Sequence, residues 1–366
     1  MGFRCGIVGL PNVGKSTLFN ALTSTAAAQA ANYPFCTIEP NIGRVAVPDD
    51  RLFKLADLAK SGKILPAQME FVDIAGLVKG ASTGEGLGNQ FLSHIREVDV
   101  IAHVLRCFES GDITHVEGSV DPIRDAEIVE TELLLADMQS LEKRLPNLEK
   151  KVRSGEKEAK EQFELINKIL PLLAEGKPAR ALSLNDEQKR TMKLLQLITS
   201  KPVMYVCNMS EEEVLADNKY SESVKKKAEE EGATVALISA KIEEEIANLE
   251  SEEEKKEFLD SLGLEETGLS RIIKEGYKLL NLTTFFTIGP KEARAWTTHK
   301  GASASEAAGV IHTDFQRGFI CAETISYNDY ANCGSENAAK ENGKMRTEGK
   351  EYVIKDGDIF HFRFNV

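Results

Sequence analysis

The segment at residues 9–16 constrains the fold of this chain more than any other feature. It reads Gly9-Leu-Pro-Asn-Val-Gly-Lys-Ser16 and lies between an apolar, strand-like run at residues 3–8 and a helix-like stretch at residues 17–23. The pattern G-x-x-x-x-G-K-S between a strand and a helix is that of a phosphate-binding loop. In such a loop Lys15 reaches the β and γ oxygens, and Ser16 offers its hydroxyl to Mg²⁺. The pattern predicts a nucleoside triphosphate site in an α/β fold, a P-loop NTPase G domain with a mostly parallel sheet.

A carboxylate and a threonine are further candidates for the metal site. A second strand-like run ends at Asp73, where a Mg²⁺-coordinating residue belongs in such a fold, and we assign Asp73 to the metal through water. Thr37 lies in a Pro-bracketed, loop-like segment at residues 32–41, which is typical of a mobile segment that closes on the γ-phosphate. The predicted metal ligands are Ser16, Thr37 and Asp73, and the loop residues predicted to hold the nucleotide are Asn12, Val13, Gly14, Lys15, Ser16 and Thr17.

Two alternatives are open for positioning the attacking water. Leu77 stands where many GTPases carry a glutamine, and its side chain can neither donate nor accept a hydrogen bond. His115, in the loop after the next strand-like run, could orient or deprotonate water. Asn12 could instead ligate K⁺ beside the phosphates, supplying charge where an arginine finger would act. The catalytic candidates are therefore Lys15 and His115, with K⁺ at Asn12 as the alternative to the histidine.

The base-binding motif departs from that of a GTPase. A strand-like run at residues 201–207 leads into Asn208-Met-Ser-Glu211, where a GTPase has Asn-Lys-x-Asp and its aspartate accepts two hydrogen bonds from guanine. Glu211 is one methylene longer than aspartate, so the motif indicates weakened guanine selectivity. It does not by itself establish a preference for adenine, because a carboxylate also accepts from the adenine N6 group. The residues predicted to bind the base are Asn208, Met209 and Glu211, together with Ser239 and Ala240 of a Ser-Ala-Lys loop.

Composition and charge exclude several classes of protein. A chain of 366 residues is long for one hydrophobic core and predicts two to three domains. No run approaches the roughly 18 apolar residues of a membrane span, and the N-terminus lacks the features of a signal peptide. The six cysteines are scattered without metal-type spacing, which favours reduced thiols in a cytoplasmic protein. The net charge of -13 argues against a uniformly basic surface for nucleic acid.

Residues 128–198 carry the pattern of a helical coiled-coil hairpin inserted between the metal-binding and base-binding motifs. Apolar residues alternate by three and four up to a break at Ser154-Gly155 and resume after it. Two helices that pack on each other explain this stripe, each about 30 Å long at 1.5 Å per residue. Pro146 is expected to kink the first helix. The stripe residues are Met138, Leu141, Leu145, Leu148 and Val152, then Ala159, Phe163, Ile166, Leu170 and Leu173.

The last part of the chain predicts a small mixed sheet with one helix, which is typical of a β-grasp fold. The Glu-rich stretch before it, at residues 243–257, is interpreted as a solvated helix face. The expected strands span residues 284–288, 293–298, 319–325 and 359–364, the helix residues 305–311 and a turn residues 356–358. We therefore expect a G domain at residues 1–127 and 199–280, the helical insertion at residues 128–198 and a β-grasp domain at residues 281–366.

These motifs in this order resemble the Obg-related branch of G proteins, and the match to its YchF subfamily, the Obg-like ATPases, is close over essentially the whole chain. The phosphate loop and the Asn208-Met-Ser-Glu211 motif show no departure from the subfamily pattern. The remaining residues that carry the resemblance are the stretch at residues 32–37, Asp73-Ile-Ala-Gly-Leu77 and the Gly-rich segment through Phe91-Leu-Ser-His-Ile-Arg96.

The resemblance implies a Mg²⁺-dependent ATPase that hydrolyses ATP slowly to ADP and phosphate without an arginine finger. It also implies a catalytic histidine at the position of His115, association with ribosomes as a translation-linked or stress-linked regulator, and a C-terminal TGS domain, a ubiquitin-like module thought to contact RNA. A GTPase switch and a nucleotide-gated adaptor with incidental hydrolysis remain alternatives. The candidates for RNA contact are Arg294, Trp296, His299, Lys300 and Arg317.

Overall fold

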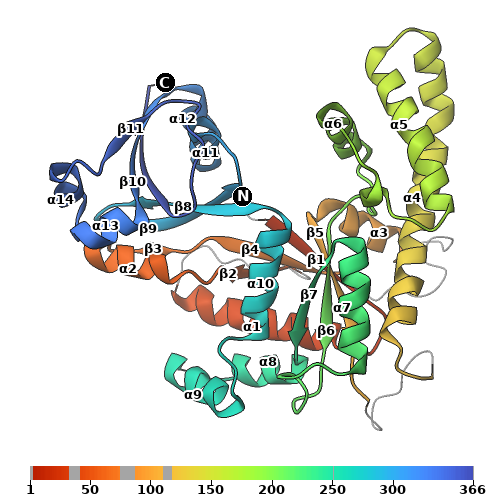
Figure 1. Ribbon diagram of the computed structural model, residues 1–366, viewed down its shortest axis with the longest axis horizontal. Helices are drawn as coiled ribbons and strands as arrows, with labels where there is room; N and C mark the ends of the chain where they lie inside the picture. Colours follow the sequence, from red (N-terminus) through yellow and green to blue (C-terminus); the bar gives the residue numbers. More distant parts are fainter. Residues whose placement is uncertain (1–2, 33–41, 75–86, 110–117, 250, 366) are drawn as a thin grey trace.

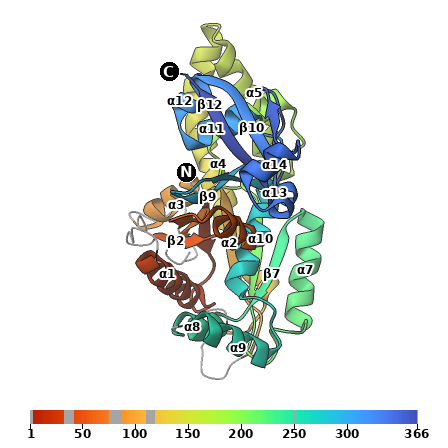
Figure 2. The same cartoon turned by 90° about the vertical axis from the view of Figure 1, so that its left-hand side faces the viewer.

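Two six-stranded sheets and a helical arm make up the protein (Figure 1). The computed structural model describes residues 3–32, 42–74, 87–109, 118–249 and 251–365. Figures 1 and 2 show that the arm and the second sheet lie on the side of the molecule opposite helices α8 (Ala240–Ala247) and α9 (Glu252–Leu262).

The first sheet has the order β2-β4-β1-β5-β6-β7. Strand β2 runs antiparallel to β4, and all other neighbours are parallel. Every residue of β5 and β6 is buried, as expected for apolar strands that are covered on both faces. The predicted, mostly parallel sheet is confirmed. Its strands are β1 (Phe3–Val8), β2 (Ile42–Ala46), β4 (Gln68–Asp73), β5 (Val100–Arg106), β6 (Val203–Asn208) and β7 (Thr234–Ile238).

Helices cover both faces of the first sheet. On one face, α1 (Lys15–Asn32) packs on β2 and β4, and α10 (Gly268–Leu279) packs on β6 and β7. On the other face, α3 (Leu87–Glu97) contacts β1, α4 (Pro122–Arg153) contacts β5, and α7 (Lys219–Glu231) contacts β6 and β7. The layers are those of a doubly wound α/β domain.

One acidic residue in the Glu-rich stretch is not solvated, and the interpretation of residues 243–257 as a solvated face is wrong at that point. Glu243 is buried, and its carboxylate accepts hydrogen bonds from Gly268 N at 2.7 Å and Leu269 N at 3.1 Å. Burial raises the pKa of Glu243. The side chain thus satisfies two backbone donors at the start of α10 and ties this helix to α8.

The arm is the predicted helical hairpin. Helix α4 pairs with α5 (Lys157–Ala174), the connection falls at the expected break, and all ten stripe residues belong to one apolar cluster. A further short helix, α6 (Asp186–Leu195), joins the cluster after the 3-10 turn η1 (Ala179–Ala181). Helix α4 begins at Pro122 rather than near residue 128 and has 32 residues, so it is about 48 Å long. It continues through Pro146, where the expected kink stays a prediction.

Polar contacts hold the base of the arm to the first sheet. Asp137 of α4 is fully buried and accepts hydrogen bonds from Ile198 N at 3.0 Å, Thr199 N at 2.8 Å and the Thr199 hydroxyl at 2.8 Å. Burial raises the pKa of Asp137, while these donors and Arg96 act in the opposite direction. The carboxylate therefore fixes α4 to the segment that leads into β6.

The second sheet confirms the predicted mixed sheet at the C-terminal end of the chain. Its order is β11-β10-β12-β8-β9-β3, with β12 parallel to β8 and β10 antiparallel to β12. The turn at residues 356–358 is present, whereas β11 and three of the four helices were not predicted. The strands are β8 (Leu282–Ile288), β9 (Ala293–His299), β10 (Phe319–Ser326), β11 (Arg346–Glu348) and β12 (Asp358–Phe364), and the helices are α11 (Ala304–Ile311), α12 (Thr313–Arg317), α13 (Tyr327–Cys333) and α14 (Glu336–Glu341).

Two elements from the first part of the chain belong to the second sheet. Strand β3 (Ile64–Leu65) pairs in parallel with β9, and α2 (Asp50–Ala59) packs on β8 and β9. Arg51 of α2 binds Asp356 at 2.6 Å, and its guanidinium lies 5.4 Å from the centroid of the Phe286 ring. The predicted division at residue 281 stays a prediction, but these contacts attach the second sheet firmly to the N-terminal part of the chain.

The described cysteines are free thiols, in agreement with the expectation from their spacing, and Cys36 lies outside the described residues. No helix in the described part of the chain is long and apolar enough to cross a lipid bilayer.

We predict that Asp137→Asn lowers the free energy of unfolding by about 2 kcal/mol, because an amide replaces an ionised acceptor of several buried hydrogen bonds. Urea unfolding followed by circular dichroism measures the change. Asp186→Asn is the matched control, since Asp186 is exposed on the first turn of α6. Equal unfolding midpoints for the two variants would show that Asp137 does not anchor the arm.

Candidate nucleotide site

The predicted nucleotide motifs meet at one edge of the first sheet. Strands β1, β4, β6 and β7 run in the same direction, so their carboxyl ends lie together. The phosphate loop follows β1, Asp73 ends β4, Asn208 ends β6, and Ser239 follows β7. The fold thus brings together four groups that are separated by up to about 230 residues in the chain.

The phosphate loop requires glycine where its backbone passes close to other groups. Gly14 has a φ of 99°, and a Cβ atom there would clash with the side-chain amide of Asn208. Gly9 has a φ of 152°, and its Cβ would lie 2.5 Å from the Val104 carbonyl oxygen. These are conformations and approaches that glycine alone tolerates well. The loop then enters α1, where Leu18 N donates to Gly14 O at 3.0 Å.

Lys15 is buried within the loop, and its ammonium donates to the Leu10 carbonyl oxygen at 2.6 Å. Burial lowers the pKa of Lys15 to about 8, and the charge of Asp73 partly offsets this effect. Burial likewise raises the pKa of Asp73, and Lys15 opposes that shift. The ammonium is held at the place where added negative charge, such as phosphate, would stabilise its protonated form.

The donor set at this edge fits a magnesium ion. Ser16 is exposed on the first turn of α1, and Asp73 is half-buried beside Ile7 of the strand that leads into the loop. A hydroxyl and a carboxylate are hard oxygen ligands, which Mg²⁺ prefers. In the described ranges no group of three or more His, Cys, Asp and Glu residues could hold a metal. Magnesium usually takes further ligands from phosphate and water, and the remaining predicted protein ligand, Thr37, lies outside the described residues.

The Asn208 side chain connects the phosphate loop to the base loop. Its Nδ2 atom donates to the Val13 carbonyl oxygen at 2.9 Å, and its Oδ1 atom accepts from Ala240 N at 2.9 Å. Asn208 is buried, as are Val13, Ser239 and Ala240. Both hydrogen bonds are made to the protein backbone, so the Asn208 side chain holds the two loops in register.

The next residues of the base motif differ in burial. Met209 is buried in the core of the first sheet, and its backbone N–H donates to the Ile238 carbonyl oxygen at 2.8 Å. Glu211 instead reaches the surface, where its carboxylate binds the Lys241 ammonium at 2.5 Å. The site residues predicted from the sequence do not include Lys241, although it belongs to the Ser-Ala-Lys loop. The sequence carries no signal for this ion pair, because 30 residues separate the two partners and only the fold brings them together.

Three residues discussed for the site lie outside the described residues: Thr37, Leu77 and His115. Their roles in metal binding and water positioning stay predictions. Asn12, the alternative candidate through K⁺, is exposed in the phosphate loop with a φ of 62°.

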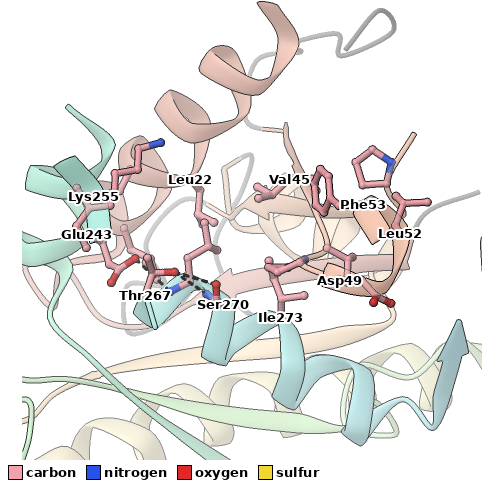
Figure 3. Close-up of a pocket in the computed structure, with 18 residues that line it drawn as sticks. Leu22, Val45, Asp49, Leu52, Phe53, Glu243, Lys255, Thr267, Ser270 and Ile273 are labelled. Carbon is pink, nitrogen blue, oxygen red and sulfur yellow. Dashed lines mark hydrogen bonds between the residues drawn. The ribbon is translucent and has the colours of Figure 1, made fainter. Parts of the chain in front are cut away.

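A separate cavity of about 460 Å³ lies between α1, α2 and α10 (Figure 3). Its floor is apolar, with Leu22, Val45 and Ile273 pointing into it. The carboxylates at its rim are engaged by the protein, because Asp49 caps α2 and Glu243 caps α10. None of the residues predicted to bind nucleotide lines this cavity.

Known protein families match two parts of the chain. Residues 4–136 match a family described as "50S ribosome-binding GTPase". Residues 282–365 match the C-terminal family of YchF GTPases, described as "Protein of unknown function (DUF933)". The first match contains the phosphate loop and Asp73, and the second contains most of the second sheet.

Individual relatives match from end to end. The protein from Haemophilus ducreyi named "Ribosome-binding ATPase YchF" is 55% identical over 366 residues, covering all of both chains. The Bacillus subtilis protein of the same name is 55% identical over 369 residues, again covering all of both chains. The solved structure of the Schizosaccharomyces pombe YchF GTPase is 43% identical and superposes with a TM-score of 0.87, covering 99% of this chain and 98% of that one.

Lys15 generates a prediction for the pH dependence of stability. Its pKa in the folded state, about 8, lies below the ordinary value of 10.5, so the buried charge destabilises the folded state fully below pH 8. This destabilisation disappears as the pH rises from 8 to 10.5, because the lysine then loses its proton in both states. Lys15→Met removes the charge at every pH. We therefore expect the variant to be more stable than the wild type at pH 7 and the difference to shrink between pH 8 and about 10.5. Urea unfolding at several pH values measures it, and a difference that stays constant over this range would contradict the low pKa.

Proposed function

Because the chain belongs to the YchF family, we propose that it is a Mg²⁺-dependent ATPase that converts ATP to ADP and phosphate and binds the ribosome. The observation that carries the proposal is the base motif. Asn208 holds the phosphate and base loops together as a nucleotide site requires, while Glu211, at the position of the guanine-binding aspartate, is engaged by Lys241. The relatives named as ribosome-binding ATPases support the same reading.

The phosphate loop supplies the groups for binding and charge stabilisation. We propose that the backbone amides of residues 12–17 and the N-terminus of α1 hold the phosphates, with Lys15 on the β and γ oxygens. Ser16, Thr37 and Asp73 would hold the metal. When bound, Mg²⁺ neutralises charge that develops on the transferred phosphoryl group. Either His115 or K⁺ ligated by Asn12 would assist the attack of water.

The base motif favours adenine over guanine because two of its side chains lack the interactions with guanine that a GTPase makes. The buried Met209 side chain cannot flank a base as the lysine of a GTPase does. The Glu211 carboxylate accepts from Lys241, and this competes with hydrogen bonds from guanine. A GTPase that tolerates Glu211 is the rival function, and it requires this ion pair to open when the nucleotide binds.

The contacts of α3 support a link between the nucleotide and the arm. This helix follows the Gly-rich stretch at residues 76–88, and at its end Arg96 donates to the Gln196 carbonyl oxygen at 2.9 Å and lies 3.4 Å from Asp137. Lys201 in turn donates to the Arg96 carbonyl oxygen at 3.0 Å. A movement of α3 would therefore reach the buried anchor of the arm. We propose that the nucleotide state reaches the arm, and through it the ribosome, by this route. In the rival function, a nucleotide-gated adaptor, the same route would operate and hydrolysis would be incidental.

Contact with RNA through the second sheet is the finer part of the proposal. The Arg294 guanidinium lies 3.9 Å from the centroid of the Trp296 ring, and Trp296 Nε1 donates to the Thr287 hydroxyl at 2.9 Å. Arg317 is exposed on α12. Nucleic-acid bases can stack on an aromatic ring or on a guanidinium group. The Arg294–Trp296 pair therefore supports contact with RNA, without a preference for a particular RNA sequence.

The proposed function is tested by calorimetric titration of nucleotide-free protein with non-hydrolysable analogues of ATP and GTP in the presence of Mg²⁺ and K⁺. We expect the ATP analogue to bind at least tenfold more tightly, which corresponds to about 1.4 kcal/mol. Lys15→Met is the control and should weaken binding of both analogues, because it removes a contact with phosphate rather than with the base. Tighter binding of the GTP analogue by the wild type would make the protein a GTPase and overturn the proposal.

A further inference from the structure

The ion pair between Glu211 and Lys241 lies at the surface of the base site. It joins the end of the base motif after β6 to the first turn of α8, and the atoms Oε2 and Nζ are 2.5 Å apart. The side chains are 36% and 66% exposed, so the pair is not part of the core. The hydrogen bond to Glu211 raises the pKa of Lys241, with Glu245 and Glu212 acting in the same direction. Lys241 is therefore a cation at neutral pH.

The position of Lys241 is unfavourable for helix stability. Ser239 is the N-cap of α8, so Lys241 lies in the first turn, where the helix dipole disfavours a positive charge. Exposed ion pairs contribute little to stability, so the pair at most offsets that cost. Stability alone thus gives little reason for a lysine here, and its partner, Glu211, points to nucleotide recognition.

Guanine and adenine differ in the hydrogen-bonding groups at ring positions 1 and 2, which a carboxylate in the base site would contact. Guanine presents donors at N1 and N2, which a free carboxylate accepts. Adenine presents an acceptor at N1 and has no N2 amino group. An ammonium group has three N–H donors, and one of them is used on Glu211. The pair therefore places N–H donors beside the carboxylate in this part of the site, and these donors suit adenine N1 and oppose the guanine N1–H.

We propose that Lys241 is a specificity-determining residue that selects adenine by occupying Glu211 and presenting its remaining N–H groups to the base. The inference rests on the proposed function and adds to it a residue that supplies hydrogen-bond donors to the base. A free Glu211 carboxylate would still accept hydrogen bonds from guanine N1 and N2. Lys241 opposes this by competing for the carboxylate.

The test compares four proteins for binding of non-hydrolysable ATP and GTP analogues with Mg²⁺: the wild type, Lys241→Met, Glu211→Gln and the double variant. Methionine keeps a long apolar side chain but removes the charge, so packing against a base is retained. Lys160→Met is the matched control, because Lys160 is an exposed lysine in an ion pair on the arm. Melting followed by circular dichroism confirms that each variant is folded.

We expect Lys241→Met to change the ratio of GTP to ATP affinity by at least tenfold in favour of GTP, while Lys160→Met leaves the ratio within twofold of the wild type. In the double variant this gain should disappear, because no carboxylate remains to accept from guanine. An unchanged ratio in Lys241→Met, or a gain that persists in the double variant, would overturn the inference. A wild type that prefers GTP would contradict the proposed ATPase, and the shift caused by Lys241→Met would still report on the role of Lys241.

Discussion

The side-chain amide of Asn208 is the interaction on which the nucleotide site depends. One end of this amide holds the carbonyl of Val13 in the phosphate loop, and the other end holds the N–H of Ala240 in the base loop. Gly14 is required directly beside it, since a side chain there would clash with the amide. The geometry of the phosphate loop is therefore determined by a residue that follows it by almost 200 positions. The phosphate loop and the proposed base loop are therefore connected through one buried side chain.

The rest of the fold supports this edge of the first sheet through polar contacts, of which those of Glu243 and Asp137 are buried. Glu243 fixes the start of α10 to α8, so the helix that continues from the base loop cannot move independently of the sheet. Asp137 fixes the arm, and Arg51 fixes the second sheet. Each of these side chains satisfies several donors or acceptors at once, which makes its removal costly. These contacts consequently attach the arm to the segment that leads into β6 and the second sheet to the N-terminal part of the chain.

Much of this architecture is predictable from the sequence, because it depends on local patterns. Apolar runs followed by glycine or polar motifs predict the parallel strands and the phosphate loop, and the alternation by three and four predicts the hairpin with all its stripe residues. The pairing of β3 with β9 was not predictable, since two residues carry too little pattern. Glu243 was misread because an acidic run is usually solvated, and only the tertiary contact with Gly268 buries it. The pair of Glu211 and Lys241 depends on the approach of two loops, which no sequence pattern reports.

In the proposed function, Asn208 assembles the site at which ATP is hydrolysed. Single-turnover hydrolysis of ATP with Mg²⁺ tests this role most directly. The wild type is compared with Asn208→Ala and with Asn248→Ala, because the exposed Asn248 amide donates to the Glu244 carbonyl oxygen of its own helix. We expect the wild type and Asn248→Ala to release phosphate at the same rate. Release by Asn208→Ala should be at least tenfold slower, since two hydrogen bonds of about 1 kcal/mol each are lost between the loops. Equal rates for all three proteins, or no phosphate from the wild type, would contradict the account.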